Sequence, residues 1–214
     1  MTRKLLIFEL MMIAVAIIAT VLLYPHFPAR VATHWGLNGQ PNGFSPKGAL
    51  WVLGPGVLIL ILVLGAVTPW LSPHRLDVDA FRSTYNFIML AVFLMMAYCY
   101  AIILSAGAGL HIDIAHLVIG GACLLIAAIG NVLSKVRRNF YIGVRTPWTL
   151  SNERVWYATH RFAGRCFVVA GLLGLAMALA GAQIGPIVVI LAGALAPVIY
   201  SLVFYKRLEH RGEL

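Results

Sequence analysis

The residues best suited to acid–base chemistry in this chain are Glu153 and His160, which lie in a polar segment, residues 137–164. On a helix their separation places them on one face, two turns apart, where a carboxylate and an imidazole could exchange a proton. A helix-capping acid and an interfacial histidine explain the same pair more simply. The sequence contains no His-Glu-x-x-His motif, no Gly-x-Ser-x-Gly motif and no paired aspartates in an apolar run. We therefore expect a protein that is not an enzyme.

The same segment is rich in residues that fix the shape of the backbone. Gly143 permits a conformation closed to other residues. Pro147 fixes its own φ angle and restrains Thr146 before it. Ser151 is expected to cap a helix whose first turn contains Glu153. These residue types indicate an ordered loop.

The helix expected after Ser151 has two unlike faces. One face holds Trp156, Thr159, His160 and Ala163, and the other holds Arg154, Tyr157, Arg161 and Arg165. A basic amphipathic helix of this kind is expected to lie on the membrane surface before it turns into the next apolar run. Anchoring explains the arginines but not the shape-fixing residues, so we expect the segment to bind a partner as well. The candidate binding residues are Asn139, Gly143, Arg145, Thr146, Pro147, Trp148, Asn152, Glu153, Trp156, Thr159, His160 and Arg161.

A second polar loop, residues 25–48, is rich in proline and glycine and contains two Asn-Gly pairs. Such pairs favour tight turns with positive φ, and the valine, threonine and tryptophan between them could form a short strand pair. We expect a compact cap. His26 and His34 fit no helical metal-binding pair and have no acidic or cysteine partner nearby, so no metal or cofactor is expected. The candidate binding residues are Pro28, His34, Trp35, Gly39, Gly43 and Lys47.

The rest of the chain is apolar. Of its 214 residues 61% are hydrophobic and only 11% are charged, and the mean hydropathy is +0.91. A soluble domain carries about a quarter charged residues, so a soluble protein is excluded. Six runs are long enough to cross a bilayer, at residues 5–24, 49–71, 85–105, 112–134, 162–182 and 184–205. We predict an all-α integral membrane protein with six transmembrane helices.

The distribution of basic residues predicts the orientation of these helices. If the N-terminus is inside, only Arg30 and Lys47 of the sixteen Lys and Arg residues fall outside, and Arg75 is among those inside. The positive-inside rule therefore predicts that both termini are cytoplasmic, with residues 25–48 forming an outer loop and residues 135–161 an inner loop. The net charge of +9 follows this topology pattern, so we expect no direct binding of nucleic acid.

Several features leave alternatives open. Gly54-Pro55-Gly56 and Pro197 interrupt apolar runs, as in transporters, although such breaks also occur in ordinary membrane helices; a small transporter or channel is therefore the alternative function. In the fifth run, small residues recur every fourth position from Ala170 to Ala182, which predicts close packing within the chain or in a homodimer. Glu9 lies within the first run as a functional candidate or a snorkelling acid.

The inner loop resembles a known family. Residues 139–161 are similar to the hallmark of the SdpI family of bacterial membrane proteins. They read Asn-Phe-Tyr-Ile-Gly-Val-Arg-Thr-Pro-Trp-Thr-Leu-Ser-Asn-Glu-Arg-Val-Trp-Tyr-Ala-Thr-His-Arg. The outer loop, with its His34-Trp35 pair and the stretch Gly-Gln-Pro-Asn-Gly-Phe, resembles a domain of unknown function that is often fused to that family. This resemblance predicts a two-span unit at residues 1–71 and a four-span unit at residues 72–214.

The resemblance also implies a function. Family members are thought to protect the cell from a membrane-active peptide toxin, and the founding member recruits a soluble repressor to the membrane. We therefore expect an immunity or sensor protein of the bacterial cytoplasmic membrane. Its expected partners are the lipid bilayer, a secreted peptide at the outer loop and a repressor-like protein at the inner loop.

Overall fold

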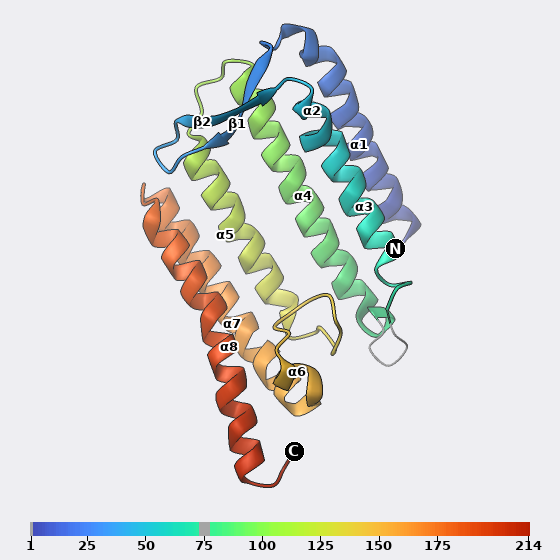
Figure 1. The fold of residues 1–214 in the computed structure, drawn as a ribbon, viewed down its shortest axis with the longest axis vertical. Helices are drawn as coiled ribbons and strands as arrows, with labels where there is room; N and C mark the ends of the chain where they lie inside the picture. The colour runs from blue at the N-terminus through green and yellow to red at the C-terminus, as the bar shows by residue number, and fades with distance from the viewer. Residues whose placement is uncertain (1, 73–77) are drawn as a thin grey trace.

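The computed structural model describes residues 2–72 and 78–214, so Arg75, counted above among the inner basic residues, lies outside the described part. The chain is mostly helical (Figure 1). The helices are α1 (Arg3–Leu23), α2 (Ala49–Trp51), α3 (Val57–Val67), α4 (Arg82–Gly107), α5 (Ile114–Leu133), α6 (Pro147–Ser151), α7 (Glu153–Leu179) and α8 (Ile184–His210). Short 3-10 turns cover Tyr24–His26 and Val78–Phe81, and a π-helix covers Val52–Gly56.

Six helical segments in the described residues are long and apolar enough to cross a membrane, which confirms the expected helical membrane protein. They are Arg3–His26, Ala49–Val67, Val78–Gly107, Ile114–Leu133, Glu153–Leu179 and Ile184–His210. The second segment contains the π-helix around Pro55, because a proline has no N–H to donate and its ring displaces the preceding turn. The break expected there is confirmed, whereas Pro197 lies inside the continuous helix α8.

The outer loop folds into an antiparallel hairpin of β1 (Arg30–Trp35) and β2 (Pro41–Pro46), which confirms the expected strand pair. Gly39 turns the chain with a φ of 72°, as an Asn-Gly pair favours. The second Asn-Gly pair, Asn42-Gly43, does not form the expected tight turn. Gly43 lies within β2 opposite His34 and has no positive φ; a Cβ there would lie 2.9 Å from the His34 Cβ.

The helices pack around two separate cores. Near the hairpin, Phe27 and Val31 pack against Leu50, Phe93 and other residues of α1, α3 and α4. Near the inner loop, a second cluster surrounds Trp156 and includes Val136. The hairpin and the loop with α6 lie at opposite ends of the bundle, and both termini point away from the hairpin (Figure 1). Each core therefore supports one of the two structured loops.

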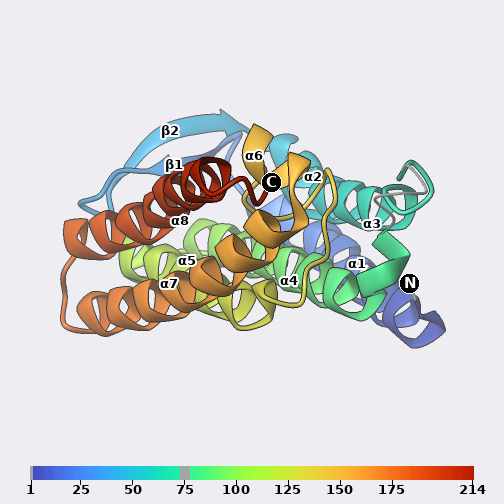
Figure 2. The ribbon, with the colours of Figure 1, turned by 90° about the horizontal axis from the view of Figure 1, so that it is seen from below.

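Helix α7 lies against both α5 and α8 (Figure 2). Its small residues make this possible: a Cβ on Gly174 would meet the Cys123 sulfur at 2.9 Å, and Ala170 faces Gly193 of α8. Ala170 and Ala178 are buried inside the single chain. The small-residue face is therefore used for packing within the chain, and the homodimer through the fifth span stays a prediction.

The start of α7 corrects a second expectation. The amphipathic segment and the fifth span form one continuous helix, which begins at Glu153 with Asn152, not Ser151, as its cap. The Asn152 Oδ1 accepts hydrogen bonds from the N–H groups of Arg154 and Val155. The apolar side of the first turns is covered by the inner loop and α5 instead of the membrane surface.

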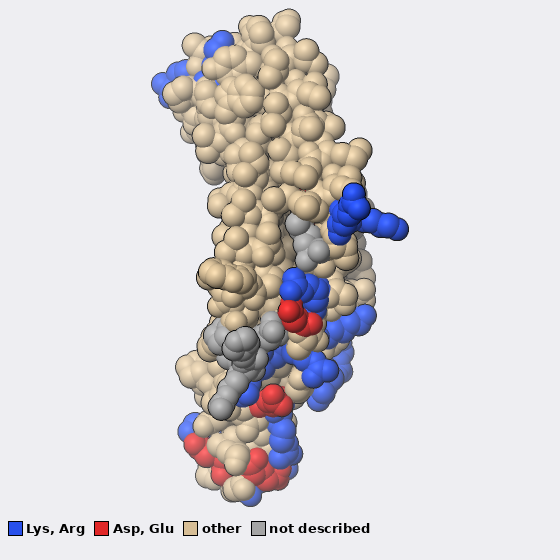
Figure 3. Space-filling view, turned by 90° about the vertical axis from the view of Figure 1, so that its right-hand side faces the viewer, with Lys and Arg blue, Asp and Glu red and all other residues tan. Residues whose placement is uncertain are grey.

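Charged side chains are concentrated toward the two ends of the bundle. On the face shown in Figure 3 they gather over the lower half and at the extreme top, with an uncharged surface between them. An uncharged belt between two charged ends suits a chain that spans a bilayer. The orientation of the termini stays a prediction.

Candidate functional site

The inner loop is organised around the side chain of Asn139, which is fully buried. Its amide nitrogen donates to the carbonyl oxygens of Arg137 and Ile142, at 2.8 and 3.1 Å. Its Oδ1 accepts from the N–H groups of Tyr141 and Ile142, at 2.7 and 2.8 Å. One side chain thus satisfies four backbone groups of an irregular segment that has no ladder partner.

His160 holds the next part of the loop against α7. The Val144 N–H donates to its Nε2 at 3.1 Å, and its Nδ1 lies 2.8 Å from the Trp156 carbonyl oxygen. Since Nε2 accepts a hydrogen bond, we assign the ring proton to Nδ1, so the imidazole is neutral. The loop can approach so closely only because residue 143 is a glycine, with a φ of 113°.

Trp156 forms the floor of the loop. It is fully buried, its indole N–H donates to the Val136 carbonyl at 2.8 Å, and its ring stacks on His160 with centroids 4.0 Å apart. We expected Trp156 to be a binding residue, and its burial corrects this. Thr159, another expected binding residue, is also fully buried, and its hydroxyl has no hydrogen-bond partner among the described residues. These residues, with Asn139 and His160, shape the loop from inside.

Helix α6 closes the loop. Thr146 caps it with a reciprocal pair of hydrogen bonds to Thr149, and Pro147 occupies the first helical position, where no N–H is needed. The Thr149 hydroxyl donates to the Val144 carbonyl at 2.8 Å. The indole N–H of half-buried Trp148 donates to the Ser201 hydroxyl at 2.5 Å and ties α6 to α8.

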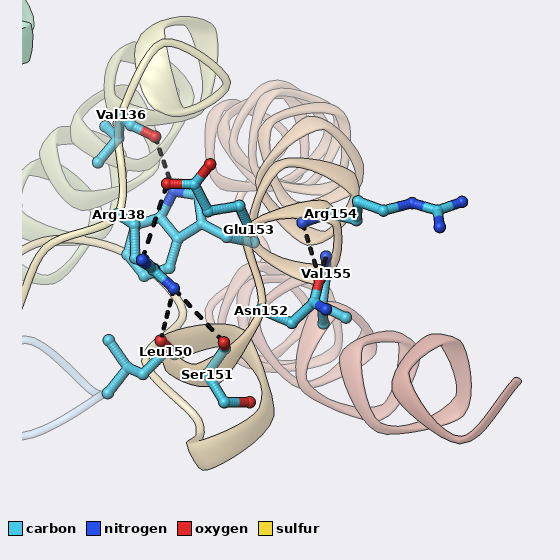
Figure 4. Close-up of polar contacts among 9 residues, drawn as sticks. Val136, Arg138, Leu150, Ser151, Asn152, Glu153, Arg154 and Val155 are labelled. Carbon is cyan, nitrogen blue, oxygen red and sulfur yellow. Dashed lines mark hydrogen bonds and ion pairs between the residues drawn. The ribbon is translucent and has the colours of Figure 1, made fainter. Parts of the chain in front are cut away.

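Arg138 joins the end of α6 to the start of α7 (Figure 4). Its guanidinium donates to the carbonyls of Leu150 and Ser151, at 3.2 and 3.4 Å, and lies 3.8 Å from the Glu153 carboxylate. A cation there complements the free carbonyls of a helix end. Glu153 and His160, the pair considered for acid–base chemistry, have different surroundings, because Glu153 is exposed and His160 is buried.

Four of the expected inner-loop residues remain exposed: Pro147, Glu153, Arg145 and Arg161. The Arg145 guanidinium also donates to the Phe140 carbonyl, which holds the end of this side chain against the loop.

The expectation missed three supports, namely Arg138, Thr149 and Ser201. The spacing Thr-Pro-Trp-Thr is a capping pattern that could have revealed Thr149. Nothing local marks Arg138 or Ser201, because their partners are distant in sequence.

At the other end, the hairpin covers a cavity of about 330 Å³. The cavity lies between β1, the loop after it, and the outer ends of α4 and α5. Its lining is Thr33, His34, Trp35, Gly36, Leu37, Cys99, Ile102, Ile103, Ile114, Ala115, Val118 and Ile119. The walls are mainly apolar, so this space suits apolar groups.

The expected outer-loop residues have different places. His34 and Trp35 line the cavity, and the His34 Nδ1 lies 2.5 Å from the Asn42 Oδ1. The Lys47 ammonium lies over the Tyr24 ring, 4.6 Å from its centroid, where it attaches the hairpin to the end of α1. Pro28 is exposed beside β1, and Gly39 and Gly43 serve the turn and the strand pair.

Asp113 caps α5 at the same end. The His116 N–H donates to its carboxylate at 3.1 Å, and the His116 Nδ1 lies 2.6 Å from the other carboxylate oxygen. The backbone hydrogen bond in particular lowers the pKa of the Asp113 carboxyl from its ordinary value, with the His116 side chain adding to the effect. The residue is exposed, so the pair fixes the entry of α5 without burying a charge.

The fold and its two loops define a multi-pass helical membrane protein with an ordered structure at each end of the bundle. Residues 135–201 match the SdpI/YfhL protein family, and residues 11–59 match a domain of unknown function, DUF1648. The similarity to the SdpI/YfhL protein family that the inner loop predicts is therefore confirmed. The chain is 25% identical over 207 residues to the "Immunity protein SdpI" of Bacillus subtilis (strain 168), covering 95% of this chain and 97% of that protein. No solved structure matches the chain significantly.

Proposed function

We propose that this chain is a membrane immunity protein that protects a bacterial cell from a membrane-active peptide met at the outer face of the cytoplasmic membrane. The similarity to an immunity protein over nearly the whole chain supports this function. The observation that carries it is the cavity of about 330 Å³ beneath the hairpin. The protein acts by binding, and no catalytic step is required.

The cavity has the chemistry of a receptor for apolar side chains. Its apolar walls include residues of α4 and α5, with Ile102 and Val118 among them, while Thr33 and His34 of β1 add polar groups. A membrane-active peptide carries apolar residues that enter the lipid. Transfer of these residues from water into such a pocket lowers the free energy. Capture at this level keeps the peptide from inserting further.

The same bundle links the cavity to the inner loop. Helix α5 begins with Ile114, which lines the cavity, and ends with Leu133, which packs in the core around Trp156. A shift of α5 on peptide binding would therefore reach the loop. The exposed Arg145 and the half-buried Trp148 then form the surface that a soluble regulator with acidic groups would recognise.

Protection is tested by challenging cells that lack or express the protein with membrane-active peptides and measuring survival. Val118 and Leu117 are neighbours on α5 with the same 37% exposure, but only Val118 lines the cavity. Val118→Trp should fill the cavity and abolish protection, whereas Leu117→Trp should preserve it at equal membrane levels. Equal survival with and without the protein, for every peptide tried, would refute the proposed function.

The regulatory step needs a separate test. Arg145→Ala should abolish recruitment of a cytoplasmic partner, read by membrane fractionation after peptide challenge, while protection persists. Arg211→Ala, which removes an equally exposed charge near the C-terminus, is the matched control. Recruitment that both variants retain would argue against the Arg145 surface.

A further inference from the structure

A second groove lies between α5 and α7, near the inner loop. Its volume is about 470 Å³, and it is lined by Gly130, Asn131, Ser134, Arg161, Gly164, Arg165, Val168 and Val169. The two helices meet closely at its base, where a Cβ on Gly164 would lie 2.8 Å from the Gly130 carbonyl oxygen. Larger residues at this contact would separate the helices and fill the groove.

Arg161 and Arg165 stand one helical turn apart beside this groove, and both are exposed. Neither forms an ion pair within residues 2–72 and 78–214. The nearby acids are engaged by other cations: Glu153 lies beside Arg138, and Glu213 lies 2.9 Å from Arg154. Two guanidinium groups are thus left beside a groove that also offers the Ser134 hydroxyl and the Asn131 amide.

The surroundings of these arginines change from polar to apolar along α7. Val168 and Val169 continue the groove away from the inner loop, and Val169 is 63% exposed. Another groove, of about 360 Å³, lies on the other side of α7, against α8. It shares Arg165 and Val169 with the groove between α5 and α7. Two apolar grooves therefore converge on one arginine at the level where a charged headgroup would meet the hydrocarbon of a bilayer.

We propose that the groove at Arg161 and Arg165 holds one anionic phospholipid. Its phosphodiester is bound by the two guanidinium groups, which present the donors that suit phosphate oxygens. Its acyl chains lie along α7 in the grooves on either side of Val169. This site is distinct from the cavity under the hairpin. It also means that Arg161 binds the lipid and is not part of the surface around Arg145 that is proposed to contact a soluble partner.

The test uses the full chain purified in a mild detergent, with phosphatidylglycerol and phosphatidylcholine as the two probes. Native mass spectrometry counts the lipids retained by the protein. The wild type should retain one phosphatidylglycerol in preference to phosphatidylcholine. Arg161→Gln with Arg165→Gln should weaken phosphatidylglycerol binding about thirtyfold, the factor expected from two arginines at an anionic surface.

Arg207→Gln with Arg211→Gln is the matched control, because it removes two exposed charges from α8 and its end without touching the groove. This control should bind phosphatidylglycerol like the wild type. Equal loss in both double variants, or equal retention of the two lipids by the wild type, would overturn the proposal. Thermal unfolding without lipid checks the fold. Should the double variant not fold, Arg165→Gln alone removes the residue shared by both grooves and must weaken phosphatidylglycerol binding about fivefold, the factor expected from one arginine.

Discussion

The Nε2 atom of His160 lies so close to residue 143 that a Cβ there would clash with it, and the adjoining N–H of Val144 donates to that same nitrogen. A loop residue without a side chain and a buried helical histidine therefore form one contact. The contact explains why a loop with so many polar groups can lie flat against a helix.

Substituting Gly143 tests this contact. Gly143→Ala must both adopt a φ of 113° and displace the His160 ring. We expect a loss of about 3 kcal/mol in the free energy of unfolding, measured by thermal or denaturant unfolding in detergent. Gly109→Ala is the control, because Gly109 has a φ of 83° but open space around it. Equal losses in the two variants would mean that backbone strain alone, and not the histidine contact, is responsible.

The hydrogen bonds of the Asn139 amide should contribute to stability as much as the packing of this side chain does. Asn139→Asp turns a donor of two hydrogen bonds into an acceptor that faces the carbonyls of Arg137 and Ile142. The buried mismatch should cost about 2–3 kcal/mol of stability. Asn152→Asp is the matched control, since this cap uses only its oxygen, and it should be neutral within about 0.5 kcal/mol. A neutral Asn139→Asp would contradict the central role of this side chain.

The bond between Trp148 and Ser201 should couple α6 to α8. Trp148→Phe and Ser201→Ala each remove one partner, and the double variant completes a cycle. We expect a coupling energy of about 1 kcal/mol in unfolding measurements. Strictly additive losses would show that the two residues stabilise the protein independently.

The Asp113 cap should give the protein a pH dependence at acid pH. Its pKa is lowered in the folded chain, so its stabilisation is complete above the ordinary carboxyl pKa of about 4 and is lost as the pH falls through the lower folded value. Thermal unfolding of the wild type should therefore decline on acidification. Asp113→Asn keeps a capping oxygen and removes the charge, so its melting temperature should fall less steeply over the same range. Parallel curves for the two proteins would exclude this contribution.

Local patterns predicted much of this structure because the relevant forces act over short separations. Length and hydropathy revealed the six apolar helices, since each must satisfy its backbone within one segment. The strand pair and the turn at Gly39 followed from residue type in the same way. The turn predicted at the Asn-Gly pair of residues 42–43 is absent from the described hairpin. Strand pairing of Gly43 with His34 outweighed the turn preference of Asn-Gly.

The site was harder to read, because a sequence shows which residues are unusual but not which way they face. Trp156 and Thr159 were chosen as binding residues for their chemistry, yet both point into the core beneath the loop. Arg138 was overlooked, although it joins α6 to α7, because its partners lie more than ten residues further along the chain.

The sequence alone determined that this chain lives in a bilayer, that it crosses it as helices and that its polar loops are ordered, because hydropathy and backbone preference are properties of single residues and near neighbours. Only the tertiary structure decided that Asn139 and His160 support the loop from inside and that a cavity opens under the hairpin. It also decided that Arg161 and Arg165 lie beside a groove without an ion pair to any described residue. Burial, cavities and unpaired charge arise when distant segments meet, and the order of residues along the chain does not record them.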